Sequence, residues 1–207
     1  MALDLSVYLV LGPETQNPIE VAKAAERGGV GLVQWRDKSG NAAAQVEAVA
    51  ELVNALTIPV VVNDRADVAV AAGAAGVHVG HGDIHPTAAR HIVGPDGIVG
   101  LTIHTQEEAR AARGAPIDYA SVGGVFATKS KINSHPPIGI GGFLAISELL
   151  RNDSGVPVIA IAGIDADRAA ALAKAGAAGV AVMSAITKAA DAEGAARALR
   201  GAVEATR

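Results

Sequence analysis

The chain has 207 residues, half of them hydrophobic and only 2% aromatic, which is enough for one sizeable core built from small aliphatic side chains. The net charge of −4 argues against a general nucleic-acid binder, and the lack of cysteine excludes disulfides, thiolate metal sites and a cysteine nucleophile. No leader pattern and no run of 18 apolar residues occurs, so we expect a single cytoplasmic domain over 1–207 without a membrane partner; a homo-oligomer is left open.

Short apolar runs alternate with helical patterns along the whole chain. Each apolar run is rich in β-branched residues and stops at turn residues, which predicts a buried strand. The predicted strands are 5–11, 30–36, 58–62, 76–79, 97–103, one within 117–126, 156–161 and 178–183. The predicted helices are 17–28, 41–56, a short Ala-rich segment after residue 65, 87–92, one opening at 105, 144–151, 165–175 and 191–206.

Three helix starts carry specific signals. Asn17 precedes a proline, which is the usual arrangement of an N-cap and the first helical residue. Thr105 is followed three residues later by a glutamate, as in a capping box, and Asp165 is a cap for the helix that follows it. The stretch 128–143, rich in glycine and proline, is expected to be irregular.

Eight strands, each followed by a helical segment, predict a (β/α)8 TIM barrel. The strands are nearly continuous apolar runs, as in a parallel sheet that is buried on both faces. A doubly wound open sheet is the competing architecture. Its dinucleotide-binding form is disfavoured because no G-x-G-x-x-G pattern follows the first strand.

Two carboxylates follow neighbouring predicted strands, Asp64 after the third and Asp83 after the fourth. In a barrel the C-terminal ends of the strands share one mouth, so these acids are expected to converge on a hard cation, which we predict to be Mg²⁺. Asp64 could instead be a helix N-cap paired with Arg65 on the surface. The pattern His81-x-Asp83-x-His85 resembles a transition-metal site, but histidines in a glycine-rich loop are more often simple turn residues.

Basic side chains also gather at predicted strand ends, where they could neutralise a diphosphate. Arg36 and Lys38 follow the second strand, Arg65 the third and Lys131 the sixth. Gly163 and Ser184 follow the seventh and eighth strands, where many barrels bind a phosphate. Read one at a time, these segments are ordinary solvated loops; their common placement at strand ends favours a substrate-binding mouth.

Seven segments together resemble one known family. They keep their order over nearly the whole chain: 34–38 (QWRDK), 62–69 (VNDRADVA), 76–83 (GVHVGHGD), 100–105 (GLTIHT), 122–131 (VGGVFATKSK), 160–164 (AIAGI) and 179–186 (GVAVMSAI). The chain is thereby similar to thiamine-phosphate synthases. That family joins 4-amino-2-methyl-5-hydroxymethylpyrimidine diphosphate to a thiazole phosphate and releases diphosphate.

The resemblance implies roles for residues at the barrel mouth. Asp64 and Asp83 would bind Mg²⁺, and Arg36, Thr102 and Lys131 would act catalytically on the diphosphate. The substrate-binding residues would be Gln34, Trp35, Arg36, Asp37, Lys38, Asn63, Thr102, Thr128, Lys129, Ser130, Lys131, Gly163, Met183 and Ser184. No protein nucleophile is required by this reaction, which agrees with the lack of a recognisable triad.

Two alternatives remain open at this level. The sister family of thiazole tautomerases has the same barrel, but its catalytic histidine would fall where this sequence has Gly124. A non-catalytic barrel that senses a phosphorylated thiamine precursor is the second alternative. It is disfavoured by the retention of both acids and of the strand-end cations, because a sensor need not stabilise a leaving group.

Overall fold

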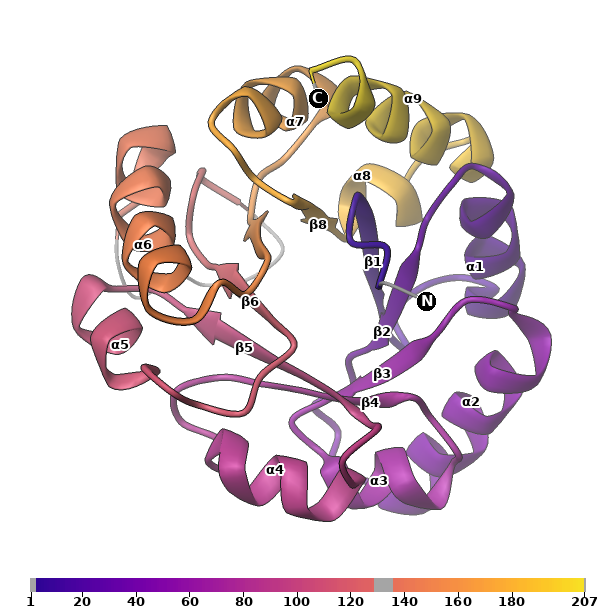
Figure 1. Ribbon diagram of the computed structural model, residues 1–207. Helices are drawn as coiled ribbons and strands as arrows, with labels where there is room; N and C mark the ends of the chain where they lie inside the picture. The colour runs from indigo at the N-terminus through magenta and orange to yellow at the C-terminus, as the bar shows by residue number, and fades with distance from the viewer. Residues whose placement is uncertain (1–2, 129–135, 207) are drawn as a thin grey trace.

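The computed structural model describes residues 3–128 and 136–206, and these residues form eight parallel strands that close into a barrel (Figure 1). Each strand pairs with its neighbours in sequence, and β1 pairs with β8 to close the ring. The strands are β1 (Val7–Leu11), β2 (Leu32–Trp35), β3 (Val60–Asn63), β4 (Gly76–Val79), β5 (Ile98–Ile103), β6 (Tyr119–Val122), β7 (Val158–Ile161) and β8 (Gly179–Val182). The predicted (β/α)8 barrel is confirmed.

Helices form a ring outside the strands (Figure 1). They are α1 (Pro18–Arg27), α2 (Ala42–Ala55), α3 (Ala66–Ala71), α4 (Pro86–Val93), α5 (Gln106–Ala111), α6 (Gly139–Ser154), α7 (Ala166–Lys174), α8 (Ser184–Thr187) and α9 (Ala192–Glu204). In the described part of the chain, no helix combines the length and apolarity needed to cross a membrane.

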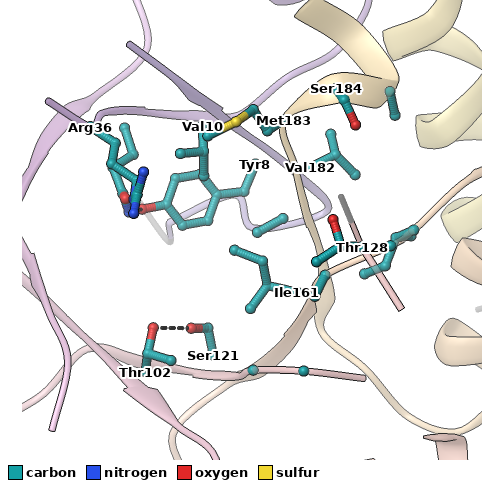
Figure 2. Close-up of a pocket in the computed structure, with 18 of the residues that line it drawn as sticks. Tyr8, Val10, Arg36, Thr102, Ser121, Thr128, Ile161, Val182, Met183 and Ser184 are labelled. Atoms are coloured by element: carbon teal, nitrogen blue, oxygen red, sulfur yellow. Dashed lines mark hydrogen bonds between the residues drawn. The ribbon is translucent and has the colours of Figure 1, made fainter. Parts of the chain in front are cut away.

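The inside of the barrel holds a small core that mixes apolar and polar side chains. Along β1, Tyr8 and Val10 point inward, as Figure 2 shows, because successive side chains of a strand alternate between its two faces. Tyr119 from β6 packs edge-on to Tyr8, with ring centroids 5.8 Å apart. This core closes the barrel beneath the mouth.

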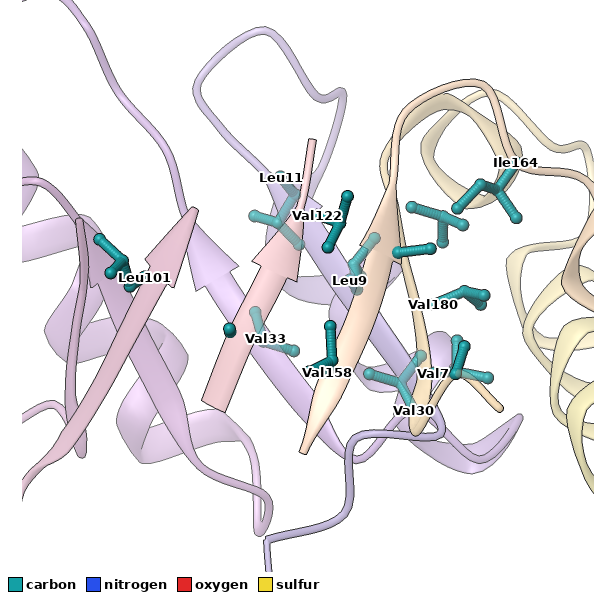
Figure 3. Close-up of a cluster of buried hydrophobic side chains, with 14 of the residues drawn as sticks. Val7, Leu9, Leu11, Val30, Val33, Leu101, Val122, Val158, Ile164 and Val180 are labelled. Atoms are coloured by element: carbon teal, nitrogen blue, oxygen red, sulfur yellow. The ribbon is translucent and has the colours of Figure 1, made fainter. Parts of the chain in front are cut away.

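A larger apolar layer lies between the strands and the helices. Val7, Leu9 and Leu11 of β1 point outward into it (Figure 3), together with Val33 of β2 and Val180 of β8. The helices meet these side chains through alanine, such as Ala22 and Ala169, and through larger aliphatic residues, such as Leu52 and Leu172. The low aromatic content of the sequence is thus accommodated by packing of aliphatic side chains.

Two of the three predicted caps, Thr105 and Asp165, are confirmed, and the one at Asn17 is wrong; Asn41, which was not predicted as a cap, also caps its helix. The side chains of Asn41, Thr105 and Asp165 accept hydrogen bonds from backbone N–H groups three residues ahead, at 3.2, 3.1 and 2.9 Å. Asn17 precedes α1 but makes no capping bond with its side chain. Its backbone is left-handed, with φ of 50°, whereas a capping side chain is normally presented by extended backbone.

The prediction of an irregular stretch up to residue 143 is wrong in its last part, because α6 begins at Gly139. The N–H of Gly139 donates to the carbonyl of Val125, which anchors the helix start just beyond β6. Gly142 lies against Ile138, where an added Cβ would come within 2.6 Å of the isoleucine Cβ. Close contact with Ile138 therefore favours glycine at position 142, although glycine within a helix is otherwise weakening.

Candidate active site

A cavity of about 560 Å³ opens among the C-terminal ends of the strands. Figure 2 shows Arg36 on one side of it and Thr128 and Ser184 on the other. The predicted substrate-binding residues that line it are Gln34, Arg36, Asn63, Thr102, Thr128, Gly163, Met183 and Ser184.

Beside the cavity, the turns after β3 and β4 bring Asp64 and Asp83 together. The backbone N–H of Asp64 donates to the carbonyl of His78 at 2.8 Å, and that of Gly80 donates to Asp83 Oδ2 at 2.8 Å. Burial raises the pKa of the Asp64 carboxyl, and the adjacent Asp83 carboxyl raises it further, while Lys38 opposes the shift. Two carboxylates held this close need a cation between them to stay ionised together.

The pair fits a metal that shares its coordination with a substrate. Within residues 3–128 and 136–206, no three His, Asp or Glu side chains converge as a ready-made metal cluster. Mg²⁺ is commonly held by one or two carboxylates together with substrate phosphates, so Asp64 and Asp83 suit it. The transition-metal pattern is not assembled as a cluster, and His85 Nδ1 instead faces the N–H of Thr87 at 3.3 Å, where it caps α4.

The strand-end cations divide into several environments. Arg36 lines the cavity, and Lys38 Nζ donates a hydrogen bond to Asp64. Arg65 makes two hydrogen bonds to Asp67 at 2.8 and 2.5 Å, so its guanidinium is engaged on the outer surface and not in the cavity. Lys129, Ser130 and Lys131, all predicted to bind substrate, lie outside the described residues.

Besides Lys38, two more of the predicted substrate-binding residues do not line the cavity. Trp35 is only 4% exposed and packs in the layer between strands and helices, because it alternates with the inward-facing Gln34. Asp37 accepts a hydrogen bond from the N–H of Ser39 at 2.7 Å and shapes the loop after β2. The contiguous motif therefore contains residues with different roles.

Asn63 has a buried polar atom without a hydrogen-bond partner in the described part of the chain. Its side-chain nitrogen Nδ2 is buried and has no hydrogen-bond acceptor among the residues that the structure describes. A buried donor without an acceptor is costly, at about 1–3 kcal/mol. Since Asn63 lines the cavity and precedes Asp64, a bound ligand is the natural source of that acceptor.

The opposite wall contains residues that the sequence analysis missed. Arg168 Nη1 donates to the carbonyl of Gly163 at 2.5 Å, and its guanidinium stacks 4.8 Å from the centre of the Phe126 ring. Arg168 and Lys188 both line the cavity. Arg168 lies within α7 and Lys188 directly after α8, whereas the sequence analysis examined only the strand ends themselves.

Ala162 lines the same wall in a conformation that is unusual for a residue with a side chain, with φ of 94°. Such backbone costs about 1–3 kcal/mol, whereas glycine adopts it freely. We expect Ala162→Gly to raise Tm by about 2–4 °C, since relief of strain exceeds the entropy cost of glycine by about 1 kcal/mol. Ala171→Gly, within helix α7, should lower Tm instead; equal shifts of both variants in differential scanning calorimetry would refute the strain argument.

A second group of missed residues lies at the bottom of the cavity. His78 is 6% exposed and hydrogen-bonds both Tyr119 and Thr102. Burial lowers the pKa of His78 to about 4, so its ring is neutral at neutral pH. Burial also raises the pKa of Tyr8 and of Tyr119, so both phenols stay protonated.

Comparison with known proteins identifies the group to which this barrel is related. The model of the thiamine monophosphate synthase family matches residues 7–186. A thiamine-phosphate synthase of Agrobacterium fabrum is 45% identical over 190 residues, covering 90% of this chain and 86% of that protein. A thiamine-phosphate synthase of Azorhizobium caulinodans is 41% identical over 210 residues, covering 99% of this chain and 97% of that protein.

Solved structures agree with the sequence comparison. The thiamine phosphate pyrophosphorylase of Pyrococcus furiosus superposes with a TM-score of 0.86 at 31% identity, covering 99% of this chain and 98% of that one. KGPDC of Streptococcus mutans, at 14% identity and a TM-score of 0.72, shares the fold alone. With a family match over most of its length and close relatives along nearly all of it, the chain belongs to the thiamine monophosphate synthase family.

Proposed function

We propose that this barrel is a transferase of thiamine biosynthesis that joins 4-amino-2-methyl-5-hydroxymethylpyrimidine diphosphate to a thiazole phosphate, giving thiamine phosphate and diphosphate. The family match and the near full-length relatives support this activity. The observation that carries the assignment of the site is the convergence of Asp64, Asp83 and Lys38 next to a cavity that Arg36 also lines. The proposal takes 1–207 as one domain.

Asp64 and Asp83 would hold Mg²⁺, in agreement with their shared position and with the raised pKa of Asp64. When bound there together with substrate, Mg²⁺ would neutralise negative charge on the diphosphate oxygens. Lys38 already contacts one of the two acids, so its ammonium is placed to exchange that carboxylate for a diphosphate oxygen. The unpaired Asn63 Nδ2 supplies a further donor for the same ligand.

The reaction needs stabilisation of charge more than proton transfer. The bond between the pyrimidine methylene carbon and the diphosphate oxygen breaks, and its electron pair leaves with the diphosphate. Arg36 and Thr102 on the cavity wall, and Lys131 by resemblance, stabilise the growing negative charge. The aminopyrimidine carries the positive charge until the thiazole nitrogen donates its lone pair to the methylene carbon and forms the new C–N bond.

The thiazole phosphate would bind at the opposite wall, against Thr128, Gly163, Met183 and Ser184. Gly163 must be a glycine there, because a Cβ would lie 2.3 Å from the carbonyl oxygen of Ala127. Ser130 completes this subsite by resemblance. Substrate anions would thus occupy opposite sides of one cavity, with the two reacting atoms between them.

Turnover tests this function directly. We expect purified protein with Mg²⁺ and both substrates to release thiamine phosphate and diphosphate in equal amounts. Chromatography measures the thiamine phosphate, and a diphosphate assay measures the second product. Omission of either substrate or of Mg²⁺ should abolish product formation. A thiazole tautomerase would isomerise its thiazole without consuming the pyrimidine diphosphate, and a sensor would bind without turnover, so either result would overturn the proposal.

A further inference from the structure

A continuous chain of hydrogen bonds runs through the interior of the barrel beneath the cavity. Gln34 Nε2 donates to the Tyr8 hydroxyl, which lies 2.9 Å from the Tyr119 hydroxyl. Tyr119 is 2.8 Å from His78 Nδ1, and His78 Nε2 is 2.7 Å from Thr102 Oγ1. Thr102 is in turn 2.9 Å from Ser121 Oγ.

The directions of the bonds from Gln34 to Thr102 follow from the first donor in this chain. The amide nitrogen of Gln34 can only donate, so the Tyr8 oxygen accepts and its hydrogen is available for the Tyr119 oxygen. Tyr119 then directs its own hydrogen to His78 Nδ1. Tyr8 and Tyr119 are 1% and 0% exposed, so once Gln34 donates to Tyr8, any other arrangement would leave a buried hydroxyl hydrogen without an acceptor.

The same logic fixes the imidazole and its bond to Thr102. With Nδ1 accepting, the neutral ring carries its hydrogen on Nε2 and donates it to Thr102 Oγ1. Either hydroxyl can donate in the bond between Thr102 and Ser121, and the one that accepts keeps its own hydrogen for a ligand. Gln34 and Ser121 both line the cavity, so the chain offers the acceptor Oε1 at one end and a hydroxyl donor at the other.

If every hydrogen bond in this network reversed its direction, the groups presented at both of its ends would change together. A rotated Gln34 amide would accept from Tyr8, and every later bond would reverse, which would leave Gln34 presenting N–H and Ser121 presenting its lone pairs. An aminopyrimidine diphosphate has an amine that donates and oxygen atoms that accept. It therefore matches the deduced direction, in which Gln34 Oε1 accepts from the amine and a hydroxyl donates to an oxygen atom.

Resting on the proposed function, we propose that Tyr119 is a positioning residue that fixes which hydrogen-bonding groups Gln34, Thr102 and Ser121 present to the pyrimidine diphosphate. Tyr119 is fully buried and is not part of the cavity wall, so it acts on the substrate only through its neighbours. Loss of its hydroxyl removes the donor to His78 and the acceptor for Tyr8. Gln34 is then free to rotate its amide and satisfy Tyr8 with Oε1.

The substitution Tyr119→Phe tests this proposal. Ser147→Ala is the control, because it removes an equally buried hydroxyl whose hydrogen bonds are all to residues of α6. We expect Tyr119→Phe to raise KM for the pyrimidine diphosphate about tenfold while KM for the thiazole phosphate stays within about twofold. Ser147→Ala should change neither constant. An unchanged KM for the pyrimidine diphosphate in Tyr119→Phe, or an equal rise in both constants, would overturn the inference.

A spectroscopic measurement separates positioning from packing and does not depend on turnover. Nitrogen NMR of protein with ¹⁵N-labelled histidine should find His78 with its hydrogen on Nε2, and Tyr119→Phe should lose this single tautomer while Ser147→Ala retains it. A hydrogen on Nδ1 in the parent protein would refute the deduced direction even if the enzyme is active. Should Tyr119→Phe fail to fold, Tyr8→Phe breaks the same chain at its link to Gln34, and the same selective rise in KM is required.

Discussion

Replacement of Asp64 by asparagine is expected to lower kcat/KM by about 10²–10³-fold without unfolding the barrel. The change removes one negative charge from the acid pair and therefore weakens the proposed metal site and the charge balance around the diphosphate. Asparagine is the appropriate replacement because Asp64 has left-handed backbone, with φ of 63°, which asparagine tolerates and alanine does not. Steady-state assays with both substrates measure the loss.

The same variant should be at least as stable as the parent protein in the absence of ligands. Burial and Asp83 raise the pKa of Asp64 in the folded state, so the Asp64 carboxylate binds a proton more tightly in the folded protein than in the unfolded chain. The stability that this group contributes is present at low pH and is lost as the pH rises through the raised pKa. Asparagine, being neutral, avoids that loss at neutral pH, and its advantage should disappear in acid.

Ligand-induced stabilisation gives a readout that is independent of catalysis. Mg²⁺ with inorganic diphosphate should raise Tm of the parent protein by about 5 °C or more at concentrations about 100-fold above Kd, and should raise that of Asp64→Asn much less. Asp67→Asn is the matched control, because Asp67 pairs with Arg65 on the outside. Normal turnover of Asp64→Asn with Mg²⁺ would contradict the metal assignment. Equal losses of activity in Asp64→Asn and Asp67→Asn would contradict it as well.

Gly163→Ala should lower both the stability of the fold and the activity of the site. Its Cβ would lie 2.3 Å from the backbone oxygen of Ala127, and φ of 66° is unfavourable for alanine. Together the clash and the backbone strain should cost about 3 kcal/mol and lower Tm by about 6–12 °C. Since Gly163 also lines the cavity, we expect kcat/KM for the thiazole phosphate to fall about tenfold or more.

A matched glycine separates the clash from the backbone effect. Gly155 follows α6 with φ of 68°, nearly the value at Gly163, yet an added Cβ there would have no atom within 4 Å. Gly155→Ala should therefore lower Tm by about 2–4 °C and leave both Michaelis constants unchanged. If the two variants lost stability and activity equally, close packing of Gly163 against Ala127 would not be the cause.

The barrel could be predicted from the sequence because its strands are buried on both faces. Runs such as Val60–Asn63 and Gly76–Val79 are mostly apolar, stop at polar turns and recur with helical segments between them. The convergence of Asp64 and Asp83 followed from the same argument, since parallel strand ends share one edge. Their binding of Mg²⁺ stays a prediction.

Other features depended on three-dimensional contacts that no local pattern encodes. The backbone of Asn17 is left-handed, and the start of α6 at Gly139 is anchored by a bond to Val125 from a distant strand end. Trp35 was grouped with its polar neighbours because they are contiguous, although alternation along β2 turns it outward. The chain through Tyr8 joins residues up to 111 positions apart, and nothing in either segment alone indicates the contact.

Closure of the ring has a consequence for how the protein is made. β1 pairs on one side with β2 and on the other with β8, where a Cβ at Gly179 would lie only 1.7 Å from the carbonyl oxygen of Leu5. Because β1 is translated first, its edge toward β8 stays unpaired until nearly the whole chain has left the ribosome. Synthesis of the chain takes on the order of ten seconds or more at usual elongation rates. Ser184, at the cavity wall, emerges after β8. Catalytic competence would thus be acquired late in synthesis, and until then the nascent edge of β1 would need shielding from other chains.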